Sequence, residues 1–327
     1  MFERLRNGWR LSSQIRKKIF SDKALLYYSI LSAIIIIVEA SAIFGSFILV
    51  NIGSLTAASA SSASSSSSGL SNAQTVEFVV LLFLFYVISS FTSAYMLMAL
   101  YIAFKSYSNG VKIGIGQAIG EASSYIGVLL EWAVFYSIVI MLIRIIEARF
   151  RGIAGAVFGF LAAATLSIGL MFAFPVIYEQ RTGPVTAMKL SAKTFISHFG
   201  SSIGGIAYSD LYGIMFAIVG VALFFVMIMA AAVFPSLSTA AVLAGIAALV
   251  IFIVAGTVIA STTSSIFRLV LYDYASGRGL PDWLDENLVK GALVKKRGAA
   301  GRGQMGGFTE DETSYMSDGS NPYAGKF

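Results

Sequence analysis

The sequence predicts an all-α membrane protein: a polytopic transmembrane bundle of six helices, built as three repeats of an interfacial amphipathic helix followed by a transmembrane hairpin. The first supporting observation is composition. Hydrophobic residues make up 57% of the 327 positions and charged residues only 12%, whereas soluble domains carry about 25% charged residues. The mean hydropathy of +0.80 agrees, because so much apolar surface requires lipid as its solvent.

Six long apolar stretches are the second observation. A helix needs about 20 mostly apolar residues to cross a hydrocarbon core about 30 Å thick. Inside lipid only helices and closed barrels satisfy every backbone polar group, and these non-alternating runs favour helices. The first run is far longer than the apolar region of a signal peptide, so we expect it to be retained. The predicted spans are residues 24–50, 75–104, 123–147, 152–177, 205–234 and 239–272.

A repeated cue before three of the spans is the third observation. NGWRLSSQIRKKIFSDK starts at Asn7, NGVKIGIGQAIGEASS at Asn109 and TGPVTAMKLSAKTFISHFGSS at Thr182. Each segment opens with a Gly that suits a tight turn, continues with mixed polarity and precedes a predicted hairpin. A related cue, with Gly279 and Pro281, follows the sixth span and predicts a fourth interfacial helix.

The domain organisation follows from these spans. We assign residues 1–297 to the six-helix membrane domain. Within it, residues 51–74 are rich in Ser and carry no charge, and they predict a flexible outer loop because they cannot bury enough apolar surface. Residues 298–327 are Gly-rich and then acidic, and they predict a disordered cytoplasmic tail.

The basic residues predict the orientation. Of the 23 Lys and Arg residues, 20 fall on one side of the six predicted spans, and only Arg144, Arg149 and Arg151 fall on the other. Short loops rich in Lys and Arg face the cytoplasm. We therefore expect a multi-pass protein of the cell membrane with both termini cytoplasmic.

Lipid-headgroup contacts are predicted on the interfacial segments. Apolar side chains on one face of the first segment are Trp9, Leu11, Ile15, Ile19 and Phe20, with basic residues elsewhere. Such a helix either lies at the lipid interface, held by apolar burial and anionic headgroups, or packs on its own bundle and stiffens it. Both readings stay open. The candidate headgroup contacts are Trp9, Arg10, Arg16, Lys17, Lys18, Lys189 and Lys193.

Charged residues inside the predicted spans are candidate polar sites. Glu39, in AIIIIVEASAIF, stands roughly 22 Å into its span and Glu131 roughly 12 Å into the third, at 1.5 Å per residue. A lone ionised group at the bilayer centre costs about 2.5–3.5 kcal/mol and usually faces the bundle interior. In one reading, Glu39 and Glu131 line a cation or proton path. In the other, Glu39 pairs with Arg144 or is a neutral acid hydrogen-bonded to a Ser or Tyr.

Rows of small residues predict close helix packing. Gly155 and Gly159 form GxxxG in the fourth span, and Gly256 and Ala260 continue a small-xxx-small row in the sixth. Such rows let two backbones approach closely. They serve either packing within the chain or an oligomer interface.

Three segments together resemble a known family. FERLRNGWRL with DKALL, FPVIYEQRTGPVTAMKLS and FRLVLYDYASGRGLPDWLDENL look like a widespread prokaryotic, largely archaeal, family of polytopic membrane proteins catalogued as a domain of unknown function. The resemblance covers residues 1 to about 295 and implies the six-helix layout and an archaeal membrane. It implies no catalytic residues. The matching positions are Gly8, Trp9, Asp22, Lys23, Pro175, Gly183, Pro184, Lys189, Ser191, Arg268, Tyr272, Tyr274, Pro281 and Asp285.

The chemistry-bearing residues narrow the function. The chain has no Cys and one His, His198, which removes disulfides, thiolate metal sites and the usual His-based catalytic and zinc sites. No HExxH, P-loop or GxSxG segment occurs. We therefore expect no enzyme activity, metal or cofactor. The RG dipeptides of the tail are too few to predict a nucleic-acid partner.

Two function classes remain foremost. The first is a non-enzymatic integral membrane protein that works through lipid contact and through association with a protein partner or with itself, a membrane assembly or scaffold role. The alternative is a small-solute or ion transporter that uses Glu39 and Glu131. A third class, a lipid-modifying enzyme, is disfavoured by the lack of a His/Cys constellation. The expected partners are membrane lipids and either a partner protein or a second copy.

Overall fold

The protein is all-α, as predicted, in every regular element that the computed structural model describes. The description covers residues 2–21, 23–61, 71–150, 153–199, 207–233, 238–278, 280–281 and 283–284. The elements are α1 (Phe2–Ser21), α2 (Ala24–Ser61), α3 (Asn72–Ser108), α4 (Ile115–Ala122), the short 3-10 helix η1 (Ser123–Tyr125), α5 (Ile126–Arg149), α6 (Ile153–Leu170), α7 (Ala173–Gln180), α8 (Pro184–Phe199), α9 (Ala207–Val233) and α10 (Ser238–Ala275).

Five described helical segments are long and apolar enough to cross a membrane, and they indicate a multi-pass membrane protein. They coincide with the first, second, third, fifth and sixth predicted spans. The third segment comprises α4, η1 and α5 as one continuous run. The five segments are Ala24–Ile52, Asn72–Ser108, Ile115–Glu147, Gly213–Ala231 and Thr239–Ala275.

The fourth predicted span, residues 152–177, is not continuous in the structure. It is divided into α6 and α7, with only Met171 and Phe172 between them. Pro175 gives the physical reason, because in an unbroken helix its ring would clash with the carbonyl of Met171. In the first turn of α7 it needs no intrahelical donor. The N–H of Phe172 instead donates to Ser191 Oγ on α8 at 2.8 Å.

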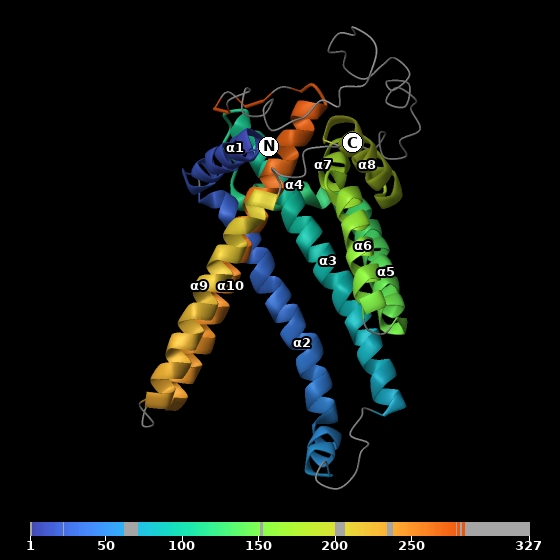
Figure 1. The fold of residues 1–327 in the computed structure, drawn as a ribbon. Helices are drawn as coiled ribbons and strands as arrows, with labels where there is room; N and C mark the ends of the chain where they lie inside the picture. Colours follow the sequence, from blue (N-terminus) through green and yellow to red (C-terminus); the bar gives the residue numbers. More distant parts are fainter. Residues whose placement is uncertain are drawn as a thin grey trace.

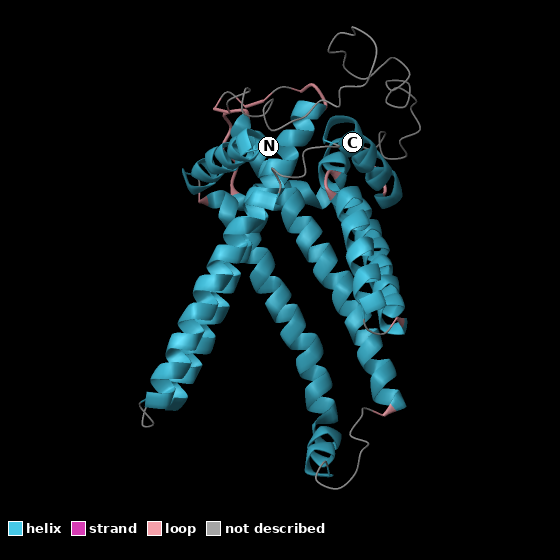
Figure 2. Ribbon diagram, in the orientation of Figure 1, coloured by secondary structure: helices cyan, strands magenta, loops and turns pink. Residues whose placement is uncertain are grey.

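The helices form two ends of different character (Figures 1 and 2). At one end, α1, α4, α7, α8 and the C-terminal parts of α3 and α10 lie close together and hold most of the buried core. We call this the packed end. Towards the other end the α9–α10 pair leans away from α2, while α5 stays beside α3 and α6 packs against α5.

Helix α1 packs on the bundle at this end. Its residues Leu11, Ile15 and Ile19 are buried, and it contacts α9 and α10. Phe20, predicted on the same face as these residues, is 47% exposed, whereas Arg16, a candidate headgroup contact, is only 8% exposed. At 3.6 residues per turn, the buried arc that contains Ile15 and Ile19 extends over Arg16 and ends before Phe20.

The predicted outer loop, residues 51–74, is shorter than expected. Helix α2 continues past residue 51, since the Ala-rich run there favours a helix, and residues 62–70 lie outside the described residues. Asn51 ties this extension to α3, because its Oδ1 accepts from Gln74 Nε2 at 2.9 Å. Ser71 starts α3 with a capping box: its Oγ accepts from the Gln74 N–H at 3.3 Å, and Gln74 Oε1 accepts from the Ser71 N–H at 2.9 Å.

Two glycines with positive φ end long helices. Gly110 (φ 79°) follows α3 and Gly277 (φ 72°) follows α10. After α10, the N–H of Arg278 donates to the Asp273 carbonyl at 3.0 Å, which is the pattern of a Schellman cap. Gly110 of the repeated Asn-Gly cue therefore closes the preceding helix. The tail 298–327 and most of the predicted fourth interfacial helix lie outside the described residues.

Small residues lie in the contact between α9 and α10. A Cβ built on Gly256 would be 2.5 Å from Phe216 Cβ, and one built on Gly213 would be 3.3 Å from Ala260 Cβ. On α6, a Cβ at Gly159 would overlap the Glu147 carboxylate of α5. These glycines allow a helix approach that a larger residue would prevent.

Candidate functional site

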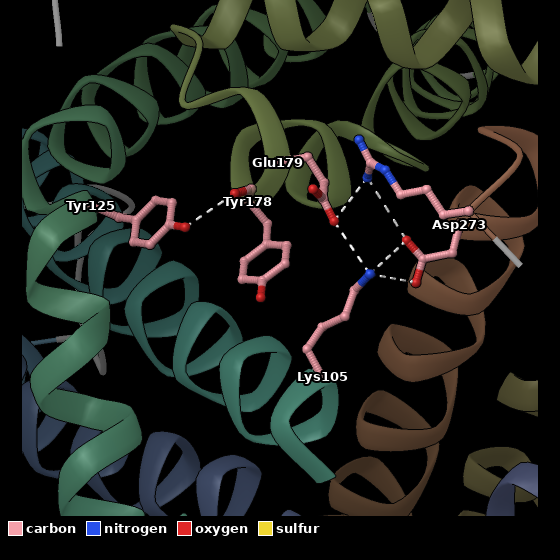
Figure 3. Close-up of polar contacts among 6 residues, drawn as sticks. Lys105, Tyr125, Tyr178, Glu179 and Asp273 are labelled. Carbon is pink, nitrogen blue, oxygen red and sulfur yellow. Dashed lines mark hydrogen bonds and ion pairs between the residues drawn. The ribbon is translucent and has the colours of Figure 1, made fainter. Parts of the chain in front are cut away.

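Four charged residues at the packed end join three helices (Figure 3). Lys105 Nζ on α3 donates to Asp273 Oδ1 on α10 at 2.9 Å and also lies 2.9 Å from Oδ2. The same Nζ lies 3.3 Å from Glu179 Oε1 on α7. Arg278 Nη1 completes the group, 2.8 Å from Glu179 and 3.9 Å from Asp273. We call these four residues the charge cluster.

The charge cluster is neutral within itself, with two cations and two anions. Its side chains are partly buried, from 11% exposed for Asp273 to 37% for Arg278. A buried charge is tolerated when an opposite charge and hydrogen bonds compensate its lost hydration. The cap at Gly277 turns the chain back over the last turn of α10, which carries Arg278 to its partners. The cluster thus fastens the ends of α3, α7 and α10 together.

Aromatic side chains continue from the charge cluster towards η1. The Tyr178 ring packs edge-on against Tyr101, with centroids 6.2 Å apart, and nearly parallel to Tyr125, at 6.1 Å and 16°. The Tyr125 hydroxyl donates to the Tyr178 carbonyl at 3.1 Å (Figure 3).

A groove of about 360 Å³ opens beside these rings, between the ends of α3, α4, η1 and α7. Arg181 borders this groove and has an unusual backbone conformation. Among the described residues other than glycine, it is the residue with a positive φ, 50°. Its guanidinium carbon lies 4.5 Å from the centroid of the Tyr125 ring, and Nη2 donates to Ser124 Oγ at 3.3 Å. We call this the aromatic groove. Its polar and aromatic lining residues are Ser106, Glu121, Ser124, Tyr125, Tyr178 and Arg181.

A second cavity, of about 300 Å³, lies between α2, α3 and α10. It is unusual for a site within apolar spans because hydroxyl groups come from all three helices. One pair, Ser29 Oγ and Thr262 Oγ1, is 2.6 Å apart and links α2 to α10. We call this cavity the lateral pocket. Its Ser and Thr lining residues are Ser29, Ser32, Ser93, Thr257, Ser261 and Ser265.

Glu39 does not pair with Arg144, so that part of the prediction was wrong. Thr92 Oγ1 on α3 donates to Glu39 Oε1 at 2.6 Å, and Glu39 Oε2 is buried with no hydrogen-bond partner among the described residues. Arg144 is 65% exposed and pairs with Glu147 at 3.0 Å. The i,i+3 spacing on one helix gives Arg144 a nearer anion than any on α2.

Glu131 and Glu39 have separate surroundings. Glu131 is exposed on α5, and its Oε2 lies 3.2 Å from where a Cβ on Gly183 would stand. That position is the turn before α8, at the packed end. Glu39 instead faces α3 through Thr92. The two carboxylates therefore do not form one site.

The candidate headgroup contacts divide into exposed and packed residues. Lys18 is half-buried, with its Nζ 4.8 Å from the Tyr107 ring centroid and 5.6 Å from that of Trp283. Like the buried Arg16, it takes part in packing at this end. The Trp9 side chain lies outside the described residues. Exposed side chains are Arg10, Lys17, Lys189 and Lys193.

Comparison with known proteins places this architecture in a family. The pattern of a family of unknown function matches residues 75–279. The chain belongs to DUF6159. The DUF6159 match is shorter than the expected extent, residues 1 to about 295, because α1 and α2 lie outside it. It includes the charge cluster and the aromatic groove. No curated protein and no solved structure matches the chain.

The charge cluster of this DUF6159 member was not predicted, although the sequence carries a signal for it. Lys105, Glu179 and Asp273 each follow within two residues of the end of an even-numbered predicted span. Even-numbered spans end on the same side of the membrane, so opposite charges at these ends meet at one level. The aromatic groove had no such signal, because most of its lining residues carry no charge.

Proposed function

We propose that this DUF6159 member is a non-enzymatic membrane assembly protein that binds a transmembrane helix of another polypeptide, a partner protein or a second copy, along α2, α3 and α10. The observation that carries the proposal is the lateral pocket. Hydroxyl groups from three helices line it.

The hydroxyl groups favour a helix over an acyl chain as the occupant. Interhelical contacts in membranes rely on small residues and on Ser and Thr hydrogen bonds, whereas lipid tails offer no hydrogen-bonding group. Thr257 and Ser261 are exposed on α10. Both residues therefore present hydroxyl groups that a docking helix can reach.

The topology is part of the proposal. We infer six crossings, with α6 and α7 together as the fourth, both termini in the cytoplasm of an archaeal cell, and three repeats in which α1, α4 and α8 each precede a hairpin. The bias of the Lys and Arg residues supports this orientation. Because the chain has no Cys, labelling of a single introduced thiol shows on which side of the membrane that residue lies. A membrane-impermeant maleimide should label Arg149→Cys from outside intact cells and should not label Lys193→Cys.

Site-specific crosslinking tests the assembly role. Ser32→Cys, Ser93→Cys and Ser261→Cys place a thiol in the lateral pocket, and each is modified with a thiol-linked photocrosslinker in native membranes. Leu142→Cys and Leu161→Cys, on exposed positions of α5 and α6, are the matched controls. We expect one common polypeptide adduct from all three pocket positions and none from the controls.

Two further arms sharpen this test. Co-expression of two differently tagged copies distinguishes a second copy from a different protein as the crosslinked chain. Ser261→Leu, which fills the pocket with an apolar side chain, should abolish the adduct formed from Ser93→Cys. Lipid adducts alone at every pocket position, or equal protein adducts at the control positions, would contradict the proposal.

A transport role is the second candidate, favoured by one observation. The Glu39 carboxyl sits between α2 and α3 with Oε2 buried and unpartnered among the described residues, and ionisable groups inside membranes often serve ion paths. Proton or cation flux into proteoliposomes that Glu39→Gln abolishes and Glu131→Gln weakens would support it. Flux unchanged by both substitutions would remove it.

A further inference from the structure

We propose that the aromatic groove binds the headgroup of a zwitterionic phospholipid, one that carries a phosphate and a primary ammonium group. The inference goes beyond the proposed function, because the groove and the lateral pocket share no lining residue. It rests on the charges that the packed end leaves uncompensated, on the position of Arg181, and on the apolar surface next to the groove.

Two opposite charges in the groove remain without an ion pair among the described residues. The charge cluster compensates Lys105, Glu179, Asp273 and Arg278 within itself. Arg181 contacts only a ring and a hydroxyl. Glu121 Oε1 accepts a hydrogen bond from Gln117 Nε2 at 3.3 Å, and no ion pair joins it to Arg181. A ligand with one anionic and one cationic group compensates both.

Arg181 is held in place for an anion. The left-handed backbone that it adopts is uncommon for a residue with a Cβ, and such conformations concentrate at functional sites. Stacking on Tyr125 and the bond to Ser124 fix the guanidinium at the edge of the groove. Its remaining N–H donors form the planar fork that suits phosphate oxygens. The Ser106 hydroxyl, on the α3 side, is a further donor in the lining.

The other side of the groove suits an ammonium group. The Glu121 carboxylate supplies the opposite charge, and the Tyr178 ring, which also lines the groove, is of the kind whose face attracts cations. The near-parallel packing of this ring on Tyr125 makes one continuous aromatic wall. A headgroup with a phosphate but no ammonium group would leave Glu121 uncompensated beside a second negative charge. The groove therefore selects zwitterionic over anionic headgroups.

The surroundings of the groove favour a lipid over a soluble phosphate compound. Exposed apolar side chains begin directly after Tyr125 and recur every four residues along α5, at Ile126 (44% exposed), Leu130 (50%) and Val134 (39%). These residues lie on α5 in the same candidate membrane span, Ile115–Glu147, that contains Glu121 and Tyr125. Ser106 lines the groove two residues before the end of the candidate span Asn72–Ser108, so the groove lies at the level of lipid headgroups.

Lipid binding to the purified full chain in detergent tests the inference. Native mass spectrometry and a thermal-shift titration would compare short-chain phosphatidylethanolamine, short-chain phosphatidylglycerol and water-soluble phosphoethanolamine. We expect phosphatidylethanolamine to bind about tenfold or more tightly than phosphatidylglycerol, the usual effect of one charge-assisted contact. Phosphoethanolamine alone should bind weakly.

Four variants assign the binding to this groove. Gly120 lines it, and a Cβ there meets nothing within 4 Å, so Gly120→Leu adds a side chain at the groove where its Cβ has room. Gly116→Leu, one turn earlier on α4 and equally open, is the matched control. Arg181→Gly should weaken both lipids about tenfold while leaving the fold intact, since glycine accepts the left-handed backbone. Glu121→Gln should make the two lipids bind about equally.

Three results would overturn the inference. The first is equal binding of the two lipids by the wild-type protein. The second is an equal effect of Gly120→Leu and Gly116→Leu. The third is phosphoethanolamine binding as tight as the lipid, which would assign the groove to a soluble compound. Crosslinking at the lateral pocket is read out separately, so failure of either proposal is recognisable by itself.

Discussion

Lys105 and Asp273 lie 168 positions apart in the chain, yet Lys105 Nζ is 2.9 Å from both carboxylate oxygens of Asp273. The contact joins the last turn of α3 to the last turn of α10. Below this level the α9–α10 pair leans away from α2 (Figure 1). The charge cluster therefore fastens the end of α10 to α3 and α7 at the packed end.

Removing the cation of this contact should destabilise the protein. Lys105→Met leaves Asp273 and Glu179 with Arg278 as their remaining cation, and we expect a loss of about 1–3 kcal/mol in the free energy of unfolding. Thermal unfolding in detergent, followed by circular dichroism, measures it. The control is Arg144→Gln, because the Arg144–Glu147 pair is exposed and such pairs contribute about 0.5 kcal/mol or less. Equal effects of the two substitutions would contradict a structural role for the charge cluster.

Ser191 should be needed for the break between α6 and α7. Ser191→Ala removes the acceptor of the buried Phe172 N–H, and an unsatisfied buried donor costs about 1–3 kcal/mol. Ser137→Ala is the matched control, because Ser137 is equally buried but bonds only the carbonyl of Ala133 on its own helix. We expect the melting temperature to fall clearly for Ser191→Ala and little for Ser137→Ala. A similar fall for both would mean that the break does not depend on this bond.

The sequence was sufficient for the features set by local hydrophobicity. Five of six predicted spans appear as long helices, because the length of an apolar run decides whether a helix can cross lipid. The start of α3 was also predictable from the sequence, since Ser71 and Gln74 form the S-x-x-Q signature of a capping box. The prediction of a loop from residue 51 was wrong at its start, because the Ala residues of this Ser-rich stretch favour the continuation of α2.

Features that depend on contacts between distant segments were not predictable in the same way. The break in the fourth span needs Pro175 in that span and Ser191 on the next helix. The predicted ion pair between Glu39 and Arg144 was wrong because the depth of a residue along a span does not determine which helix its side chain faces. Thr92 on α3 is the residue that Glu39 meets. Arg16 shows the same limit, since this basic residue beside an apolar stripe is only 8% exposed where α1 packs on the bundle.

The closest approach of α9 and α10 should tolerate no added side chain at Gly256. A Cβ there would stand 2.5 Å from Phe216 Cβ, so Gly256→Ala must push the helices apart, at a cost of about 1–3 kcal/mol. Gly45→Ala is the control, because a Cβ at Gly45 on α2 meets nothing within 4 Å and alanine favours the helix. In detergent, Gly256→Ala should lower the free energy of unfolding, whereas Gly45→Ala should raise it. A stable Gly256→Ala protein would mean that the pair packs less tightly than this.

The partner of Glu39 can be determined by a double-mutant cycle. Thr92→Val removes the donor at 2.6 Å and leaves a carboxyl with two unpartnered oxygens, so we expect a loss of about 1–3 kcal/mol. Glu39→Gln keeps a carbonyl oxygen that accepts from Thr92, and its own effect should stay within about 1 kcal/mol. In the Glu39→Gln background Thr92→Val should cost less, because leaving a neutral amide without its hydrogen-bond donor costs less than leaving a buried carboxyl without one. This difference is the coupling energy between the two positions.

A second cycle with Arg144 is the control. The effects of Arg144→Gln and Glu39→Gln on the free energy of unfolding should be additive within about 0.5 kcal/mol, as for residues that share no contact. A coupling above about 1 kcal/mol between Glu39 and Arg144 would restore the ion pair and remove Thr92 as the residue that holds Glu39 inside the membrane.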